Sequence, residues 1–130
     1  MLSRKIEQRV RQHLRLARGF LEVAVVRPES TEFEERSALS RAYYAMLHAC
    51  SAFVLSNGIE PSKSHGGLNR QARMCFGKNF GRWMDNLYGL RQNSDYEAGW
   101  TPMRHDSDAR LREARTNVLW ACREAEKKLR

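Results

Sequence analysis

Cysteine, proline and long apolar runs are all scarce in this chain. It has three cysteines and three prolines among 130 residues, and Cys50, Cys75 and Cys122 show no C-x-x-C spacing. An odd number of unpaired cysteines excludes a disulfide framework and fits a reducing cytoplasm, so we expect a cytoplasmic protein whose cysteines are small core residues. No apolar run approaches the roughly 20 residues of a membrane span, so we expect no membrane association.

Other absences exclude whole classes of fold and site. No segment alternates apolar and polar residues with a period of two, so no strand is predicted. The chain also lacks internal repeats, low-complexity tracts and interdomain linkers, and its length suits one hydrophobic core, so residues 1–130 are predicted to form a single domain. No His, Cys, Asp or Glu cluster has metal-ligand spacing, so neither a metal site nor a cofactor is expected.

The most clearly marked segment runs from Thr31 to Gly58 and is predicted to be one long core helix. Pro28 ends the preceding segment, Thr31 and Glu34 match a capping box, and Gly58 can adopt the left-handed conformation that ends a helix. Larger apolar residues recur along this segment at Leu39, Tyr43, Met46, Cys50 and Phe53. The spacers between them, which let other helices approach closely, are Ala42, Ala45, Ala49 and Ala52.

Apolar periodicity predicts four further helices. They lie at Ser3–Val26, at Ser64–Phe76, after a Gly77–Gly81 loop, and from Ser107 or Asp108 to Leu129. Residues 95–106 lack periodicity and are predicted to be a loop, whose Trp100 either folds back onto the bundle or contacts a partner. The predicted fold class is therefore all-α, an antiparallel bundle of four to five helices.

Basic residues outnumber acidic ones by 23 to 15, which gives a net charge of +8. Such a charge favours a polyanionic partner, with nucleic acid first, although it can also serve solubility alone. Basic side chains concentrate on one face of the first helix, which we interpret as a solvated face rather than a contact surface. They are Arg4, Lys5, Arg9, Arg11, Arg15 and Arg18, with Glu7 the acidic residue among them.

The end of the fourth helix carries the residues with the clearest chemistry. Arg91 and Asp95 share a helix face, but an exposed pair of this kind stabilises a helix by only about 0.2–0.5 kcal/mol. Asp95 also lies at the helix end where a negative charge is disfavoured. We therefore interpret both residues as parts of a site. A second polar stripe, on the Thr31–Gly58 helix, consists of Ser37, Arg41, Tyr44, His48 and Ser51.

Several segments, taken in order, resemble signatures of the HEPN-domain family. They are SRAYYAMLHA at 40–49, KSHGG at 63–67, FGKNF at 76–80, and Leu90-Arg91 followed by Asp95-Tyr96. The resemblance covers about residues 5–128 and is greatest to small stand-alone prokaryotic members with an Arg-x-x-x-Asp-Tyr motif. It implies a bundle of four to five helices that forms a homodimer, with the two fourth-helix motifs near the two-fold axis.

The resemblance also implies an activity and a partner. Many family members are metal-independent endoribonucleases, often toxins paired with a small nucleotidyltransferase antitoxin. Their motif is an arginine, then four to six other residues, then a histidine. Arg91 matches the arginine, which in that chemistry holds the scissile phosphate. At the spacing of the histidine this chain has Tyr96, Glu97 and Ala98, and His105 lies outside it.

Three functional interpretations remain open. In the first, this is a HEPN-like protein with a degenerate nuclease motif that binds RNA or a nucleotide as the toxin-type half of a nucleotidyltransferase pair. In the second, it is an active endoribonuclease whose general acid or base is His65, His48 or His105. In the third, it is a non-enzymatic dimer that binds a protein partner.

The candidate residues follow from these interpretations. The candidate catalytic residues are Arg91, Asp95 and Tyr96, and the candidate RNA- or nucleotide-binding residues are Asn93, Arg41, Tyr44, His48 and His65. Asn93 and Tyr96 are expected to orient a substrate by hydrogen bonds, and Asp95 to orient Arg91. The glycine pair at 66–67 beside His65 either exposes N–H groups for a phosphate or forms a flexible helix entrance.

Overall fold

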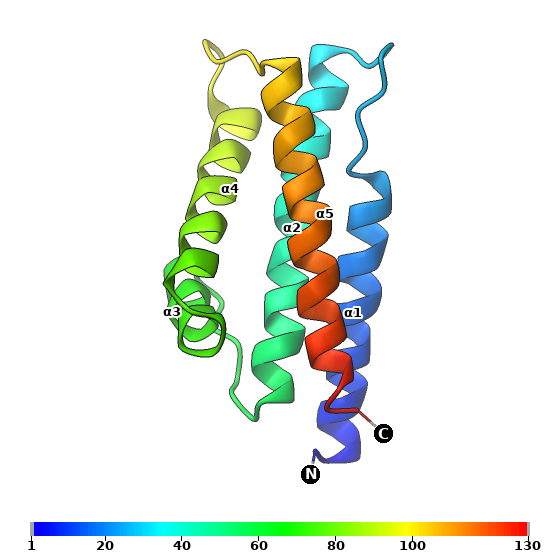
Figure 1. Cartoon of the computed structure of the whole chain (residues 1–130), viewed down its shortest axis with the longest axis vertical. Coiled ribbons are helices and arrows are strands. Elements are labelled where there is room, and N and C mark those ends of the chain that lie inside the picture. Colours follow the sequence, from blue (N-terminus) through cyan, green and yellow to red (C-terminus); the bar gives the residue numbers. More distant parts are fainter. Residues whose placement is uncertain (1, 130) are drawn as a thin grey trace.

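The computed structural model describes residues 2–129, which form five helices (Figure 1). They are α1 (Arg4–Val23), α2 (Glu32–Ser56), α3 (His65–Phe76), α4 (Lys78–Tyr96) and α5 (Arg104–Glu126). Because these residues contain no strand, the predicted all-α class and helical bundle are confirmed. The four longer helices run along the long axis of the molecule, and α3 lies beside the first half of α4 (Figure 1). None of the described helices combines the length and apolar character that crossing a membrane requires.

The central helix, α2, contacts all four other helices. It begins with the predicted capping box, in which Thr31 Oγ1 accepts from the Glu34 N–H at 3.1 Å and Glu34 Oε1 accepts from the Thr31 N–H at 3.0 Å. After its last turn, Gly58 has a φ of +79°, the left-handed conformation predicted for it. The four predicted spacers are fully buried, so neighbouring helices approach the α2 backbone closely; they are Ala42, Ala45, Ala49 and Ala52.

The glycine pair at the start of α3 forms a tight helix entrance. Ser64 caps the helix, because its Oγ accepts a hydrogen bond from the Gly67 N–H at 3.0 Å. Gly67 is buried, and a Cβ at this position would lie 2.1 Å from Ser62 Oγ. The Gly67 N–H is therefore used inside the fold, and the close approach of Ser62 explains the glycine.

The connection between α3 and α4 is shorter than the predicted Gly77–Gly81 loop, because Gly77 alone separates the two helices. Gly77 has a φ of +93°, which glycine adopts readily, and its N–H donates to the Arg73 carbonyl at 2.9 Å. Gly81 lies inside α4, where its missing Cβ leaves room for the Arg73 side chain. The loop prediction was wrong because this glycine serves close packing and not a turn.

Two of the three cysteines are core residues, as predicted. Cys50 and Cys122 are buried, and burial raises the pKa of both thiols. The prediction was wrong for Cys75, which is exposed near the end of α3. The reason is that the buried face of α3 ends one turn earlier, at Ala72.

α1 ends three residues earlier than predicted, at Val23 and not at Val26. Apolar residues continue past its end, but β-branched side chains shortly before Pro28 have a low preference for helix, and the residue before a proline is pushed out of it. Apolar residues at helical spacing nevertheless form the inner face of α1: Ile6 is partly buried, and the buried positions are Val10, Leu14, Ala17, Leu21 and Ala24.

α5 starts at Arg104, earlier than the predicted Ser107 or Asp108, so the loop covers 97–103 and not 95–106. The first residue of α5 is fixed by tertiary contacts: the Arg104 guanidinium donates to the carbonyl oxygens of Arg27 and Ser30 at 2.8 and 3.0 Å. It also forms an ion pair with Glu35 at 3.3 Å. No side chain caps this helix, so the local signal on which the prediction depended is absent.

Arg36 of α2 holds the end of α4 and the loop that follows it. Its guanidinium donates to four backbone carbonyl oxygens, which belong to Asn93, Ser94, Glu97 and Trp100. The guanidinium carbon also lies 5.4 Å from the centre of the Trp100 ring. Of the two alternatives for Trp100, the structure therefore has the one in which this side chain folds back onto the bundle.

Two histidines meet at the interface of α1 and α2. The Nδ1 atoms of His13 and His48 lie 3.0 Å apart, so one ring donates its N–H to the other. The His48 ring also stacks on Phe20, with 5.8 Å between the ring centres. Burial lowers the pKa of both histidines, that of His48 to about 4. The pair is therefore neutral at pH 7.

The close packing around α2 yields a first prediction. Ala49→Leu should destabilise the protein by about 1–3 kcal/mol, because a larger side chain at a fully buried position forces its neighbours apart. Urea denaturation followed by circular dichroism measures the change. Ala109→Leu, at an exposed position of α5, is the matched control and should change the free energy of unfolding by less than about 0.5 kcal/mol. Equal effects at both positions would contradict the close-packing argument.

The histidine pair predicts that stability falls as the pH is lowered. Because the pKa of each histidine is below its unfolded value near 6.5, the folded state binds fewer protons than the unfolded state. The contribution of the pair is therefore complete above about pH 6.5 and is lost as the pH falls toward about 4. Urea midpoints measured at intervals from about pH 7 to pH 5 should decrease.

The double substitution His13→Gln with His48→Gln should flatten this decrease, because neither amide can take up a proton. His105→Gln removes a histidine from the exposed start of α5 and leaves the pair intact, so the decrease should persist. A double variant that loses stability with pH as steeply as the original protein would rule out the pair as the cause.

Candidate functional site

The sequence-predicted residues Arg91 and Asp95 of α4 meet Tyr44 of α2. Arg91 Nη2 donates to the Tyr44 hydroxyl at 3.1 Å, and Arg91 Nε lies 3.0 Å from Asp95 Oδ2. The second distance is that of an ion pair, but the Nε–H does not point at the carboxylate and makes no hydrogen bond. Asp95 Oδ2 also accepts from the Ser40 hydroxyl at 3.2 Å. The carboxylate is thus held between α2 and α4.

Three aromatic rings surround the Arg91 guanidinium. Its central carbon lies 5.7 Å from the ring centres of Tyr43 and Tyr44 and 5.4 Å from that of Tyr96. At these distances each ring face attracts the cation. The Arg91 side chain is only 18% exposed, whereas Tyr96 is 66% exposed. We call Arg91, Tyr43, Tyr44, Asp95 and Tyr96 the Arg91 cluster.

A surface hollow of about 450 Å³ lies beside the Arg91 cluster. Its lining residues come from α1, α2 and α4 and are Phe20, Phe33, Arg36, Ser37, Ser40, Arg41, Tyr44, Ser94 and Asp95. The polar stripe of α2 therefore contributes Ser37, Arg41 and Tyr44 to this hollow. Arg41 is exposed, and none of the ion pairs found among residues 2–129 includes it.

His65 also contacts Tyr43, and it forms a polar group of its own. Its Nε2 lies 3.0 Å from Asp85 Oδ1, its Nδ1 lies 3.4 Å from the Tyr43 hydroxyl, and its ring stacks on Tyr88 with 4.1 Å between the centres. Burial raises the pKa of Tyr43 to about 12, so its hydroxyl keeps its proton and can donate to Nδ1. Neutral His65 then carries its proton on Nε2 and donates to Asp85.

The remaining candidates lie apart from the guanidinium. His48 is at the α1–α2 interface with His13, and His105 is exposed at the start of α5. The Asn93 carbonyl accepts from Arg36, and no hydrogen bond of its side chain to another described residue is found. The structure thus places Asp95, Tyr96 and Tyr44 in contact with Arg91. Arg41 lines the hollow beside them. His48, Asn93 and His105 do not contact Arg91.

Sequence reasoning missed several residues of this region. Tyr43 was treated only as a core residue, although its ring contacts Arg91 and its hydroxyl contacts His65. Asp85 and His13 were not considered, because their partners lie 20 and 35 residues away and no local spacing marks them. The motif SRAYYAMLHA contains Tyr43 and was the signal that could have included it.

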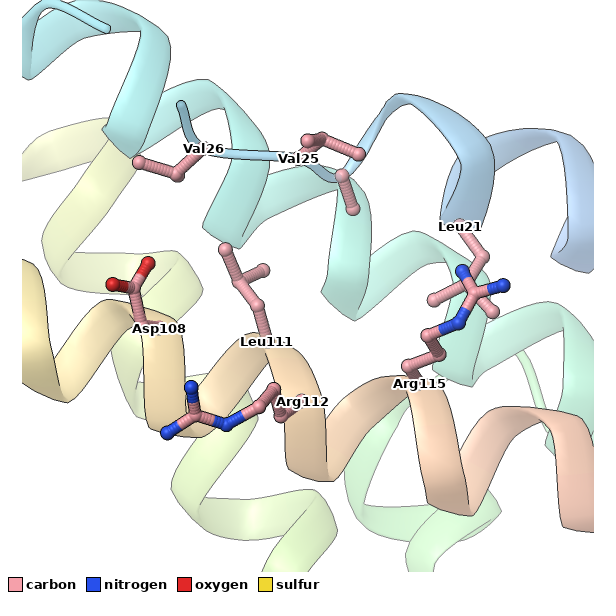
Figure 2. A pocket seen from close by; sticks show the side chains of 8 residues that line it. Leu21, Val25, Val26, Asp108, Leu111, Arg112 and Arg115 are labelled. Carbon is pink, nitrogen blue, oxygen red and sulfur yellow. The ribbon is translucent and has the colours of Figure 1, made fainter. Parts of the chain in front are cut away.

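Another hollow, of about 210 Å³, lies between the end of α1 and α5 (Figure 2). Arg112 and Arg115 line it together with Asp108 and apolar side chains such as Leu21 and Leu111. It contains none of the candidate residues. Within residues 2–129, no three His, Cys, Asp or Glu side chains are grouped closely enough to hold a metal ion.

Comparison with known proteins identifies the family. The family model described as the HEPN domain matches residues 10–127. The chain is 28% identical over 102 residues to "Putative toxin MJ0605" of Methanocaldococcus jannaschii, an alignment that covers 74% of each protein. It is 35% identical over 71 residues to "UPF0332 protein PH1297" of Pyrococcus horikoshii, which covers 55% of this chain and 48% of that protein. Because the family model spans nearly the whole described chain, this protein belongs to the HEPN-domain family.

Proposed function

We propose that this protein is the toxin-type half of a nucleotidyltransferase–HEPN pair and that it binds single-stranded RNA at the Arg91 cluster. The supporting observation is the fixed position of the Arg91 guanidinium between Tyr44, Asp95 and three aromatic rings. A guanidinium held in this way loses little further side-chain freedom when its planar donors bind a phosphate. The relative whose name is "Putative toxin MJ0605" supports the first half of the proposal.

Two neighbours of Arg91 favour RNA over an isolated phosphate. Tyr96 is 66% exposed beside the guanidinium and offers a ring on which an unpaired base can stack. Arg41 lines the adjacent hollow and supplies a second cation for the next phosphate of the strand. A stacking surface beside two cations is typical of single-strand binding.

We propose binding, with weak cleavage or none, because a suitable acid or base is missing at the guanidinium. Cleavage through a ribose 2′-hydroxyl requires a group that takes up and releases a proton near neutral pH. The described groups in contact with Arg91 include no histidine, and the polar partners of His65 are Tyr43 and Asp85. His48 is engaged with His13.

We also propose that the protein is a homodimer in which the hollows of two protomers face each other. Phe33 is 74% exposed at the rim of the hollow that Asp95 also lines. An aromatic side chain so exposed is stabilised when a second protomer covers it. A two-fold arrangement would place both Arg91 clusters along one RNA-binding channel.

The role of Arg91 can be tested by RNA binding. Arg91→Ala should weaken the binding of labelled single-stranded RNA about tenfold in fluorescence anisotropy, because it removes a bidentate phosphate contact. Arg91→Lys keeps the charge but loses the planar donors, so it should recover only part of the affinity. Arg15→Ala, at an exposed position of α1, is the control for lost charge. Equal, small losses for Arg91→Ala and Arg15→Ala would show that binding is only electrostatic background.

The dimer can be tested with light scattering. Phe33→Asp should shift the protein from dimer to monomer, because a charge would have to be buried at the interface. An aspartate in the first turn of α2 suits the helix dipole, so folding should be retained. Met74→Asp removes another highly exposed apolar side chain, far along the chain on α3, and should leave the dimer intact. A monomer at tens of micromolar for the unsubstituted protein would refute the dimer.

A further inference from the structure

The α3–α4 hairpin carries an unbalanced positive charge. Between Glu60 and Asp85 the sequence contains no acidic residue and five basic ones, which are Lys63, Arg70, Arg73, Lys78 and Arg82. All five are exposed. We call them the hairpin patch. The hairpin patch shares no residue with the basic face of α1 or with the Arg91 cluster.

The packing of α3 on α4 brings Arg73 close to the part of α4 that carries Lys78 and Arg82. Asn69 of α3 donates to the Gly81 carbonyl at 2.8 Å and to Asp85 Oδ1 at 2.9 Å. One turn later the Arg73 side chain lies on Gly81, where a Cβ would be 2.2 Å from its Cγ. α3 therefore returns alongside the first half of α4, which places Arg73 next to the segment that carries Lys78 and Arg82.

The acidic groups at the border of the hairpin are already engaged. Asp85 accepts from His65 and Asn69, and Glu60 forms an ion pair with Arg9 of α1. None of the ion pairs found among residues 2–129 includes a member of the hairpin patch. The positive charge of this patch is therefore not paired at ion-pair distance within the described fold, although Lys63 lies near enough to Glu60 to contribute to the lowered pKa of that carboxyl, whose main cause is Arg9.

The basic face of α1 differs in this respect. Arg9 pairs with Glu60, and Arg18 pairs with Glu126 of α5. These two ion pairs join distant parts of the chain. They pair two of the positive charges on the face of α1, the helix face with the most basic residues in the sequence. Two of the six basic residues of this face are thus paired within the fold, whereas no ion pair is found in the described chain for the five residues of the hairpin patch.

We propose that the hairpin patch binds the phosphate backbone of RNA as a second surface, apart from the Arg91 cluster. A polyanion backbone fits this patch better than an acidic protein does, because Met74 is the one large apolar side chain of α3 that is strongly exposed. A protein interface needs a buried apolar centre, whereas a phosphate backbone needs only cations. The first turn of α4 lacks a side-chain cap, so its N–H groups add to the positive field.

The two surfaces are separable by mutation. Arg82 and Arg91 are nine residues apart on α4, roughly 13 Å along the axis and on opposite sides of the helix. A substitution at one therefore leaves the other in place. The proposal depends on the proposed function only for the identity of the ligand as RNA.

The test compares two triple variants that lose the same charge. The first carries Arg70→Gln, Lys78→Gln and Arg82→Gln in the hairpin patch, and it spares Arg73 because that side chain packs on Gly81. The second carries Arg4→Gln, Lys5→Gln and Arg15→Gln on α1, all at exposed positions. Binding of a labelled single-stranded RNA is measured by anisotropy at several salt concentrations, and thermal melting verifies that both variants fold.

The hairpin triple variant should lose at least tenfold in affinity, and its slope of log K against log salt should become shallower by about 2, because three phosphate contacts are lost at about 0.7 each. The α1 triple variant should change both quantities by less than half as much. Equal changes in the two variants would overturn the proposal. So would competition by polyglutamate as effective as that of RNA of equal charge, which would indicate an acidic protein as partner.

Adding Arg91→Ala separates this proposal from the proposed function. If the surfaces are independent, the losses of the hairpin triple variant and of Arg91→Ala should multiply. A loss in the hairpin variant without an effect of Arg91→Ala would refute RNA binding at the Arg91 cluster and leave the hairpin patch standing. A loss with Arg91→Ala alone would refute the hairpin patch.

Discussion

The close approach of four helices to α2 is the constraint on which the rest of this structure depends. It is possible because the buried side of α2 presents alanine at every turn, so the neighbouring helices reach its backbone. The larger core side chains, such as Met46 and Leu55, fill the space between these contacts. Since α2 also carries Tyr44, Arg41 and Arg36, the same helix that organises the core fixes the position of the candidate site.

Arginines perform distinct tasks in this fold. Arg36 and Arg104 use their guanidinium groups to bind backbone carbonyl oxygens, which fixes the ends of α4 and α5 and the loops beside them. Arg91 is held in a similar way, but its partners are side chains, and it lies beside an open hollow. An arginine whose position is fixed and whose surroundings are open is available to a ligand, whereas the other two are committed to the fold.

Net charge alone describes the field of a protein, not where its partners bind. Here the basic face of α1 is partly neutralised by Glu60 and Glu126, while the ion pairs found in the described chain include no member of the hairpin patch. Tertiary contacts also engage His13, His48 and His65. His13 and His48 form a neutral pair with each other, and the polar partners of His65 are Tyr43 and Asp85. Contacts between distant segments thus decide which charged and titratable groups remain available.

The sequence by itself determined the features that depend on neighbouring residues. The capping box of α2, the cap at Ser64, the left-handed Gly58 and the apolar face of α1 could all be predicted, because each signal lies within a few residues. The pairing of Arg91 with Asp95 was also predictable from their spacing.

Only the tertiary structure decided the rest. The start of α5 depends on contacts of Arg104 with residues more than 70 positions away, and Gly81 is explained by the Arg73 side chain that covers it. The Tyr44 contact of Arg91 and the His13–His48 pair join residues that are 47 and 35 positions apart in the sequence. Helical periodicity reports which face of a helix is buried, but it contains no information on which polar groups of two different helices will meet.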